Sequence, residues 1–180
     1  MTPTRRDVLC GLSATVGAGL AGCAGALTGA DSTTAGSVTR QVGMACTVGQ
    51  ENYRFTPAVV QVPVGGEVSW GATSTCRQVS TAYHPRYDGP LRIPEAAEPW
   101  QSPILKEGQG TFAHRFEVEG VYDYHGLFEE FGQVGTVVVG NPTPDPSAEP
   151  GLTPPSPSLP APTRRQIRSL NDRVRDVLAD

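Results

Sequence analysis

The chain has 180 residues, of which 38% are hydrophobic and 18% are charged. Both fractions lie below the averages for globular proteins, about 45–50% and about 25%. This length allows one domain of ordinary size with tails, and the local clustering of glycine and proline favours a folded core with loose ends. The formal net charge of −4 leaves no basic surplus to neutralise phosphates, so we expect no nucleic-acid partner.

The first residues predict an export signal over residues 1–22. Arg5 and Arg6 form a twin-arginine pair, and the weakly hydrophobic, uncharged run that follows suits a signal better than a permanent membrane span. Leu20-Ala21-Gly22-Cys23 then resembles a lipoprotein processing box, although a run of small residues that happens to contain a cysteine would look the same. We predict lipidation at Cys23, which would anchor the protein to the outer face of the cytoplasmic membrane, outside the cytoplasm.

Composition divides the rest of the chain into four segments. Residues 23–38 are small and polar and predict a tether. Residues 39–140 hold both tryptophans and all tyrosines, phenylalanines and histidines, so they predict the folded domain. Residues 141–163 are proline-rich and predict an extended, semi-rigid spacer. Residues 164–180 predict a short amphipathic helix.

The helix prediction depends on a capping signature and a periodic apolar face. Thr163-x-x-Gln166 is typical of a capping box. The apolar residues that follow fall on one face at helical spacing: Ile167, Leu170, Val174, Val177 and Leu178. A helix of this length is marginal alone in water, so we expect it to dock on its own domain, on a partner protein or on the membrane surface.

The segment 39–140 predicts an all-β fold, a Greek-key β-sandwich. Short alternating or β-branched runs are separated by glycine and proline turns. The expected strands are Thr39–Thr47, Val59–Val64, Glu67–Ala72, Gln78–Tyr83, Thr111–Val118, Gly120–His125 and Val134–Gly140. A tyrosine just after the Gly120 turn can close a Greek-key corner through its hydroxyl.

A long insert, Pro85–Gly110, carries five prolines and predicts an ordered irregular loop over one end of the sandwich. Trp100 within it is either a binding anchor or part of a lid packed on the core. Cys46 and Cys76 are either a disulfide, which an oxidising compartment permits, or two free buried thiols.

The domain resembles the cupredoxins, small blue-copper proteins of the halocyanin and plastocyanin type. The resemblance covers about residues 40–140. It rests on Phe55-Thr56-Pro57, Val64-Gly65-Gly66-Glu67-Val68-Ser69-Trp70, the stretch from Phe112 to Tyr124, and Gly132-Gln133-Val134-Gly135-Thr136-Val137-Val138-Val139. The resemblance implies a β-sandwich that carries electrons with a copper ion.

The family's copper ligands are two histidines, a cysteine thiolate and a weak axial methionine or glutamine. At the matching positions this chain has Gln78 for the first histidine, Gly126 for the cysteine and Gln133 for the axial ligand, while the second histidine is absent. Among these, the axial position alone keeps a usable ligand. We therefore expect no competent type 1 copper site.

An altered metal site is the alternative. His84 and His125 are expected near the end of the sandwich where the family's metal sits, and Glu129 is close in sequence, so these residues could bind Cu(II) or Zn. Each histidine could equally be a surface or packing residue. His114, in the middle of a strand between Phe112 and Phe116, is expected to be a core histidine.

Three functions follow. The first is an exported, lipid-anchored binding or assembly module without type 1 copper, with a membrane electron-transfer protein as a candidate partner. The second is an electron-transfer or copper-binding protein with an altered ligand set. A hydrolase or oxidase using the histidine pair ranks last, because the sequence has no nucleophile motif and no phosphate loop; we expect no enzyme.

Overall fold

The computed structural model describes residues 38–47, 49 and 51–179. The predicted signal, the lipidation site Cys23 and nearly all of the tether lie outside these residues. No helix in the described part of the chain is both long and apolar enough to cross a membrane.

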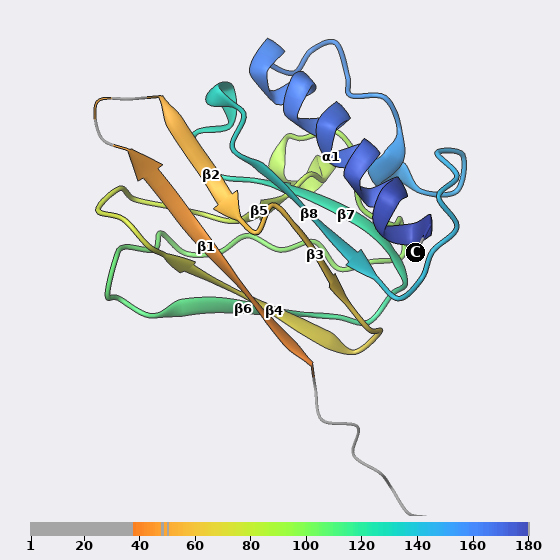
Figure 1. Cartoon of the computed structure of the whole chain (residues 1–180), viewed down its shortest axis with the longest axis horizontal. Coiled ribbons are helices and arrows are strands. Elements are labelled where there is room, and N and C mark those ends of the chain that lie inside the picture. Colours follow the sequence, from red (N-terminus) through yellow and green to blue (C-terminus); the bar gives the residue numbers. More distant parts are fainter. Residues whose placement is uncertain (1–37, 48, 50, 180) are drawn as a thin grey trace, which may run out of the picture. The chain divides into compact units, whose positions relative to one another are not determined.

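Within the described residues, eight strands form two four-stranded sheets (Figure 1). One sheet has the order β2-β1-β4-β6 and the other β3-β8-β7-β5. The strands are β1 (Thr39–Thr47), β2 (Asn52–Thr56), β3 (Val59–Val62), β4 (Gly66–Ala72), β5 (Thr81–Ala82), β6 (Thr111–Phe116), β7 (Gly120–His125) and β8 (Val134–Val139). The predicted all-β sandwich is confirmed.

The space between the sheets is filled by aromatic and branched side chains. Trp70 on β4 contacts Trp100 from the insert, with ring centroids 5.5 Å apart, and meets Tyr124 on β7 edge-on. Trp100 is 3% exposed, so it is part of the core and not a surface anchor. The hydroxyl of Tyr122 donates to the carbonyl of Val118 at 2.5 Å, which is the predicted corner.

Strand β8 is buried along its whole length because both of its faces are covered. Val137 and Val139 face the core between the sheets, whereas Val134 and Val138 face a second layer. This explains why the strand is a nearly continuous apolar run and not an alternating one.

The second layer is the helix α1 (Ala161–Ala179), which lies over β3 and β8 (Figure 1). Its buried residues include Ile167, Leu170 and Val174, as the apolar periodicity predicts. Ile167 and Leu170 pack with Tyr83 and Val134. Of the docking surfaces considered, the helix therefore uses its own domain.

The helix begins earlier than predicted, and the capping box is not used. Thr163 lies inside the helix and is buried. Its hydroxyl donates to the carbonyl of Glu129 at 2.5 Å, because the helix start packs against the loop that joins β7 to β8. The side chain of Thr163 thus fixes this loop to the helix instead of capping the helix.

Residues 141–160 are not the predicted spacer. They form one compact unit with the sandwich and include the short 3₁₀ helix η3 (Pro150–Leu152). Leu152 is 1% exposed and packs with Val121, Val138 and Val174. Prolines here favour an irregular chain, and the buried leucine holds that chain on the sheet.

Two strands also differ from expectation. β2 was not predicted: it is a five-residue edge strand that pairs with β1 in the register Cys46↔Tyr53. The expected strand Gln78–Tyr83 is reduced to two residues in β5, because Gln78 forms a bridge with Leu105, and Thr81 one with Gln101, in the insert.

Candidate functional site

The candidate site lies at the end of the sandwich where β7 stops and β8 starts. The connection between them, residues 126–133, contains the 3₁₀ helix η2 (Glu129–Phe131). His125 and Val134 form the last pair of the β7–β8 ladder. The ladder thus brings Gly126 and Gln133 opposite each other, where the amide of Gly126 donates to the carbonyl of Gln133 at 2.9 Å.

A buried pair of carboxamides occupies the centre of this end. Gln78 and Gln133 are both 0% exposed, and Nε2 of Gln133 donates to Oε1 of Gln78 at 2.6 Å. Oε1 of Gln133 accepts from the amide of Phe128 at 3.2 Å. The predicted ligand positions Gln78, Gly126 and Gln133 are therefore adjacent, and they are joined by hydrogen bonds.

Gly126 provides the space for this pair. A Cβ built on Gly126 would overlap the carboxamide of Gln133. The side chain of Gln133 therefore fills the volume that a cysteine at position 126 would need. Nε2 of Gln78 is buried without a hydrogen-bond partner among the described residues, so the packing leaves one polar group unsatisfied.

The candidate ligands of an altered metal site do not come together. His125 and Glu129 approach within 3.9 Å, measured from Nδ1 to Oε2. His84 instead caps a separate 3₁₀ helix, η1 (Pro85–Tyr87), where its Nδ1 accepts from the amide of Arg86 at 3.1 Å. Within the described ranges, no three His, Cys, Asp or Glu side chains are grouped as a metal would require.

Glu129 has a further partner that the sequence did not reveal. The buried hydroxyl of Tyr83 donates to its Oε1 at 2.8 Å. Burial raises the pKa of Tyr83, and the neighbouring Glu129 carboxylate raises it further. Tyr83 therefore remains a neutral hydrogen-bond donor to Glu129 at physiological pH.

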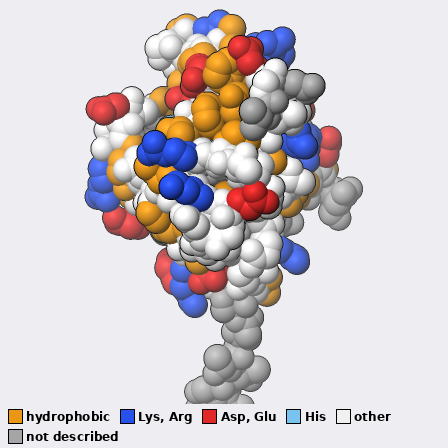
Figure 2. All heavy atoms as spheres, turned by 90° about the vertical axis from the view of Figure 1, so that its left-hand side faces the viewer, with side chains coloured by type: hydrophobic (Ala, Val, Ile, Leu, Met, Phe, Trp, Pro, Cys, Tyr) orange, Lys and Arg blue, Asp and Glu red, His pale blue; other side chains and the backbone are white. Residues whose placement is uncertain are grey.

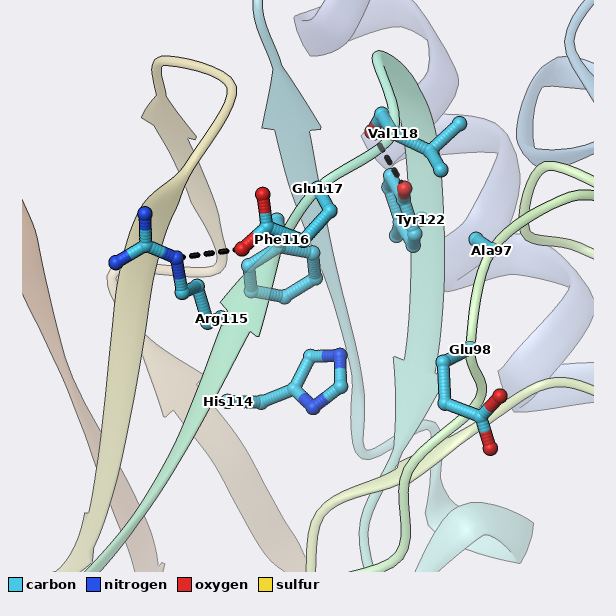
Figure 3. A pocket seen from close by; sticks show the side chains of 8 residues that line it. All are labelled: Ala97, Glu98, His114, Arg115, Phe116, Glu117, Val118 and Tyr122. Atoms are coloured by element: carbon cyan, nitrogen blue, oxygen red, sulfur yellow. Dashed lines mark hydrogen bonds and ion pairs between the residues drawn. The ribbon is translucent and has the colours of Figure 1, made fainter.

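His114 is half-buried at a small pocket on the side of the sandwich, where Figure 3 shows its ring between β6 and Glu98. The ring stacks on Trp100, with centroids 4.9 Å apart. Burial lowers the pKa of His114, and the Glu98 carboxylate opposes that shift. This placement agrees with the predicted packing role, although the ring is at the edge of the core.

The structure joins Cys46 and Cys76 in a disulfide, with their Cα atoms 6.2 Å apart. The hydroxyl of Ser74 lies beside it, accepting from the amide of Cys46 and donating to Sγ of Cys46. The bond ties β1 to the chain two residues before Gln78, so it holds the segment that carries one of the buried carboxamides.

Sequence reasoning missed a buried ion pair on the outer face of β7, the face that points away from the core between the sheets. Arg92 from the insert is 1% exposed, and its Nε donates to Asp123 at 2.8 Å. The second oxygen of Asp123 accepts from the hydroxyl of Thr136 at 2.6 Å. The guanidinium also donates to the carbonyls of Gly151 and Thr153. A single arginine among proline-rich loops gave no signal of this role.

The surface of the molecule carries charges of both signs. Figure 2 shows basic and acidic side chains interspersed on one face, with no broad field of one sign. This pattern fits the small net charge of −4.

The sequence matches no family model and no curated protein. Among solved structures, the chain is similar to a pseudoazurin from Sinorhizobium, with 21% identity and a TM-score of 0.58 over 76% of this chain and 95% of that one. A pseudoazurin from Methylobacterium extorquens AM1 gives 22% identity and a TM-score of 0.57, over 76% and 98%. A third, from Hyphomicrobium denitrificans, gives 17% and 0.55, also over 76% and 98%.

These structures are cupredoxins, so the domain described above has the cupredoxin fold, as the sequence resemblance implies. The match covers nearly the whole length of each pseudoazurin. At this level of identity the likeness establishes the fold.

Proposed function

We propose that the protein is a cupredoxin-fold binding or assembly module that works without a type 1 copper ion. It is exported, and lipid on Cys23 anchors it to the outer face of the cytoplasmic membrane. Its role is to hold a partner there, and a membrane electron-transfer protein is the candidate.

The observation that carries the proposal is the buried carboxamide pair. Type 1 copper requires a thiolate and two imidazoles, and residues 78 and 126 supply neither. The carboxamide of Gln133 fills the space beside Gly126 and is held by Gln78. Amide groups are neutral, so they cannot replace the charge of a thiolate beside a cationic metal. The residues present therefore do not fit the family's copper ion.

The loop over this end supports a binding role. Tyr53 from β2 stacks on Phe128 with ring centroids 3.9 Å apart, and Phe131 lies 5.2 Å from the same ring. Leu127 at the loop's tip is 45% exposed. Aromatic side chains are enriched in protein–protein interfaces, so we assign this loop as the surface that meets the partner.

The test is to add Cu(II) to the purified protein and to record its absorption spectrum. We expect no intense band near about 600 nm, where copper–thiolate charge transfer falls, because both described cysteines are in the disulfide. A stoichiometric, reversibly reducible blue adduct of the native protein would refute the proposal. A pseudoazurin refolded and loaded in parallel confirms that the assay detects such a site.

An altered copper or zinc site is the second candidate, and the proximity of His125 to Glu129 favours it. Calorimetry with Cu(II) and Zn(II) on His125→Ala and His84→Ala separates the cases. If metal binds at this end, His125→Ala weakens it and His84→Ala does not. Equal affinity in both variants and the native protein eliminates this candidate.

The anchor is tested separately by Cys23→Ser in the full chain expressed with its signal. Loss of the protein from the membrane fraction, together with loss of the lipid mass, is expected. Continued membrane association without lipid would contradict the anchor and leave the copper question unaffected.

A further inference from the structure

A cavity lies beside the candidate site, on the outer side of β7. One wall is formed by residues 83 and 87–90 in the turn after β5. The other wall is formed by residues 156 and 158–160. His125 and Glu129 line it between these walls. Its volume of about 660 Å³ is within the range of small-molecule sites. Neither the fold nor the carboxamide pair explains it.

The polar side chains of this cavity are two carboxylates, an imidazole and the hydroxyls of tyrosines and serines. The side chain of Glu129 is 27% exposed and has no Arg or Lys partner among the described residues. Nδ1 of His125 lies 3.1 Å from the carbonyl of Gly126. Asp88, on the turn, adds a second carboxylate to the lining.

The walls are aromatic and aliphatic. The ring of His125 lies 4.8 Å from that of Tyr83, which is 1% exposed. The lining also includes Tyr87, Pro90 and Leu159. Aromatic faces attract cations through their quadrupole, and the attraction strengthens where water is excluded.

The nearby positive charges are already engaged. The guanidinium of Arg164 donates to the carbonyls of Pro157 and Leu159, and Arg92 is paired with Asp123. Neither of them reaches Glu129 in an ion pair. The cavity therefore combines tyrosine and imidazole rings with a carboxylate that has no arginine or lysine partner among the described residues.

We propose that this cavity binds a small organic cation, a primary ammonium or guanidinium group on a short aliphatic chain. Glu129 accepts the cation's N–H groups, Asp88 attracts it, and the rings and prolines of the lining cover the methylene chain. This inference goes beyond the proposed binding role. It depends on the outer face of β7 and not on the state of the copper position.

The test uses 1,5-diaminopentane and agmatine as probes and 1,5-pentanediol as the uncharged control. Metal-free protein is titrated with each compound in the presence of a chelator, followed by calorimetry and by NMR of the backbone amides. We expect binding of both cations, with shifts centred on Tyr83, His125 and Glu129, and none with the diol.

Glu129→Gln is the diagnostic variant because its amide oxygen still accepts from the hydroxyl of Tyr83. We expect it to weaken binding by about tenfold or more, the effect of losing one charged contact. Glu130→Gln, next to it but outside the cavity, is the matched control and should bind as the native protein does. Thermal unfolding of both variants shows that they are folded.

Binding of the diol as tight as the diamine, or equal affinity in the native protein and Glu129→Gln, would overturn the inference. So would the absence of any shift with either cation up to about 10 mM, a limit that corresponds to negligible affinity. Failure here is distinct from failure of the proposed function: a blue copper adduct overturns the metal-free role whether or not the diamine binds.

Discussion

Gln133 fills a cavity and makes a hydrogen bond at the same time. Its methylenes and carboxamide occupy the space beside Gly126, and its Nε2 finds an acceptor in Gln78. A buried amide is costly unless it is paired, so each glutamine makes the other tolerable in the interior.

Replacing Gln133 by alanine is expected to lower the free energy of unfolding by about 2–5 kcal/mol, because it opens a cavity and leaves the carbonyl oxygen of the Gln78 side chain without its donor. Chemical denaturation followed by tryptophan fluorescence measures the change. The double variant Gln78→Leu/Gln133→Leu removes both polar partners and should be more stable than the sum of the two single leucine changes predicts. Simple additivity would show that the pair does not interact.

His114 predicts a specific dependence of stability on pH. Burial lowers its pKa in the folded state from the ordinary value of 6.5, so the unfolded chain takes up the proton first. The contribution of His114 to the free energy of unfolding is fully present above about pH 6.5. It declines as the pH falls from there to the lower pKa of the folded state.

Comparison of the native protein with His114→Gln, at a series of pH values, isolates this contribution. The difference in free energy of unfolding between the two proteins should change across that window and be constant above it. Because burial raises the pKa of Glu149, that group acts in the opposite direction, but it is common to both proteins and cancels. A constant difference at all pH values would contradict the assignment.

At the scale of the elements, one arginine links the insert, β7 and η3. Arg92 joins the insert to β7 through Asp123 and joins β7 to η3 through the carbonyls of Gly151 and Thr153. Arg92 thus acts on the outer face of β7, where Leu152 of η3 packs beside Val174 of α1. The proline-rich segment is therefore fixed by a buried charge as well as by Leu152.

Arg92→Met should destabilise the protein by about 3–5 kcal/mol, because it leaves the Asp123 carboxylate buried without its counterion. Urea denaturation measures this loss. Arg86→Met breaks an exposed ion pair with Glu98 and is the matched control, with little expected change. Protease cleavage within residues 141–160 should accelerate in Arg92→Met and not in Arg86→Met; equal cleavage would show that Arg92 does not hold this segment.

The elements could be predicted where local pattern and tertiary packing agree. β1, β7 and the apolar face of α1 follow directly from β-branched runs and from helical spacing. The strand around Gln78 could not be bounded, since its partners lie in an irregular insert that pattern reasoning does not pair. The segment 141–160 was misjudged because proline composition describes the free chain, whereas Arg92 and Leu152 determine its packing.

At the scale of the whole molecule, the disulfide closes a long stretch of chain that contributes strands to both sheets. Cys46 and Cys76 are 30 residues apart in sequence, and between them lie β2, β3 and β4. Closing a loop of this length restricts the unfolded chain. The sequence could show that such a bond was permitted but not that the two Cα atoms come within reach.

The double variant Cys46→Ser/Cys76→Ser should lose about 3–4 kcal/mol of unfolding free energy on the chain-entropy model. Denaturation of the native protein with and without a reductant gives an independent measure, and the reduced protein should match the variant. A native protein whose midpoint does not change on reduction would contradict this stabilising role.

The candidate site shows the same division between what sequence supplies and what it does not. Family resemblance placed Gln78, Gly126 and Gln133 at one end of the sandwich, and the structure brings them into contact. The hydrogen bond between the two glutamines joins residues that are 55 positions apart in sequence. Local sequence patterns do not predict such a contact. The pairing of Tyr83 with Glu129 likewise needs the turn after β5 to meet η2.

The overlap between Gln133 and any side chain at position 126 imposes an order on substitutions. Gly126→Cys made first would insert a thiol into occupied space, whereas shortening residue 133 first leaves a void that the thiol can then enter. A thiolate at position 126, introduced by engineering or by natural drift, therefore requires that the side chain of Gln133 be shortened or move aside.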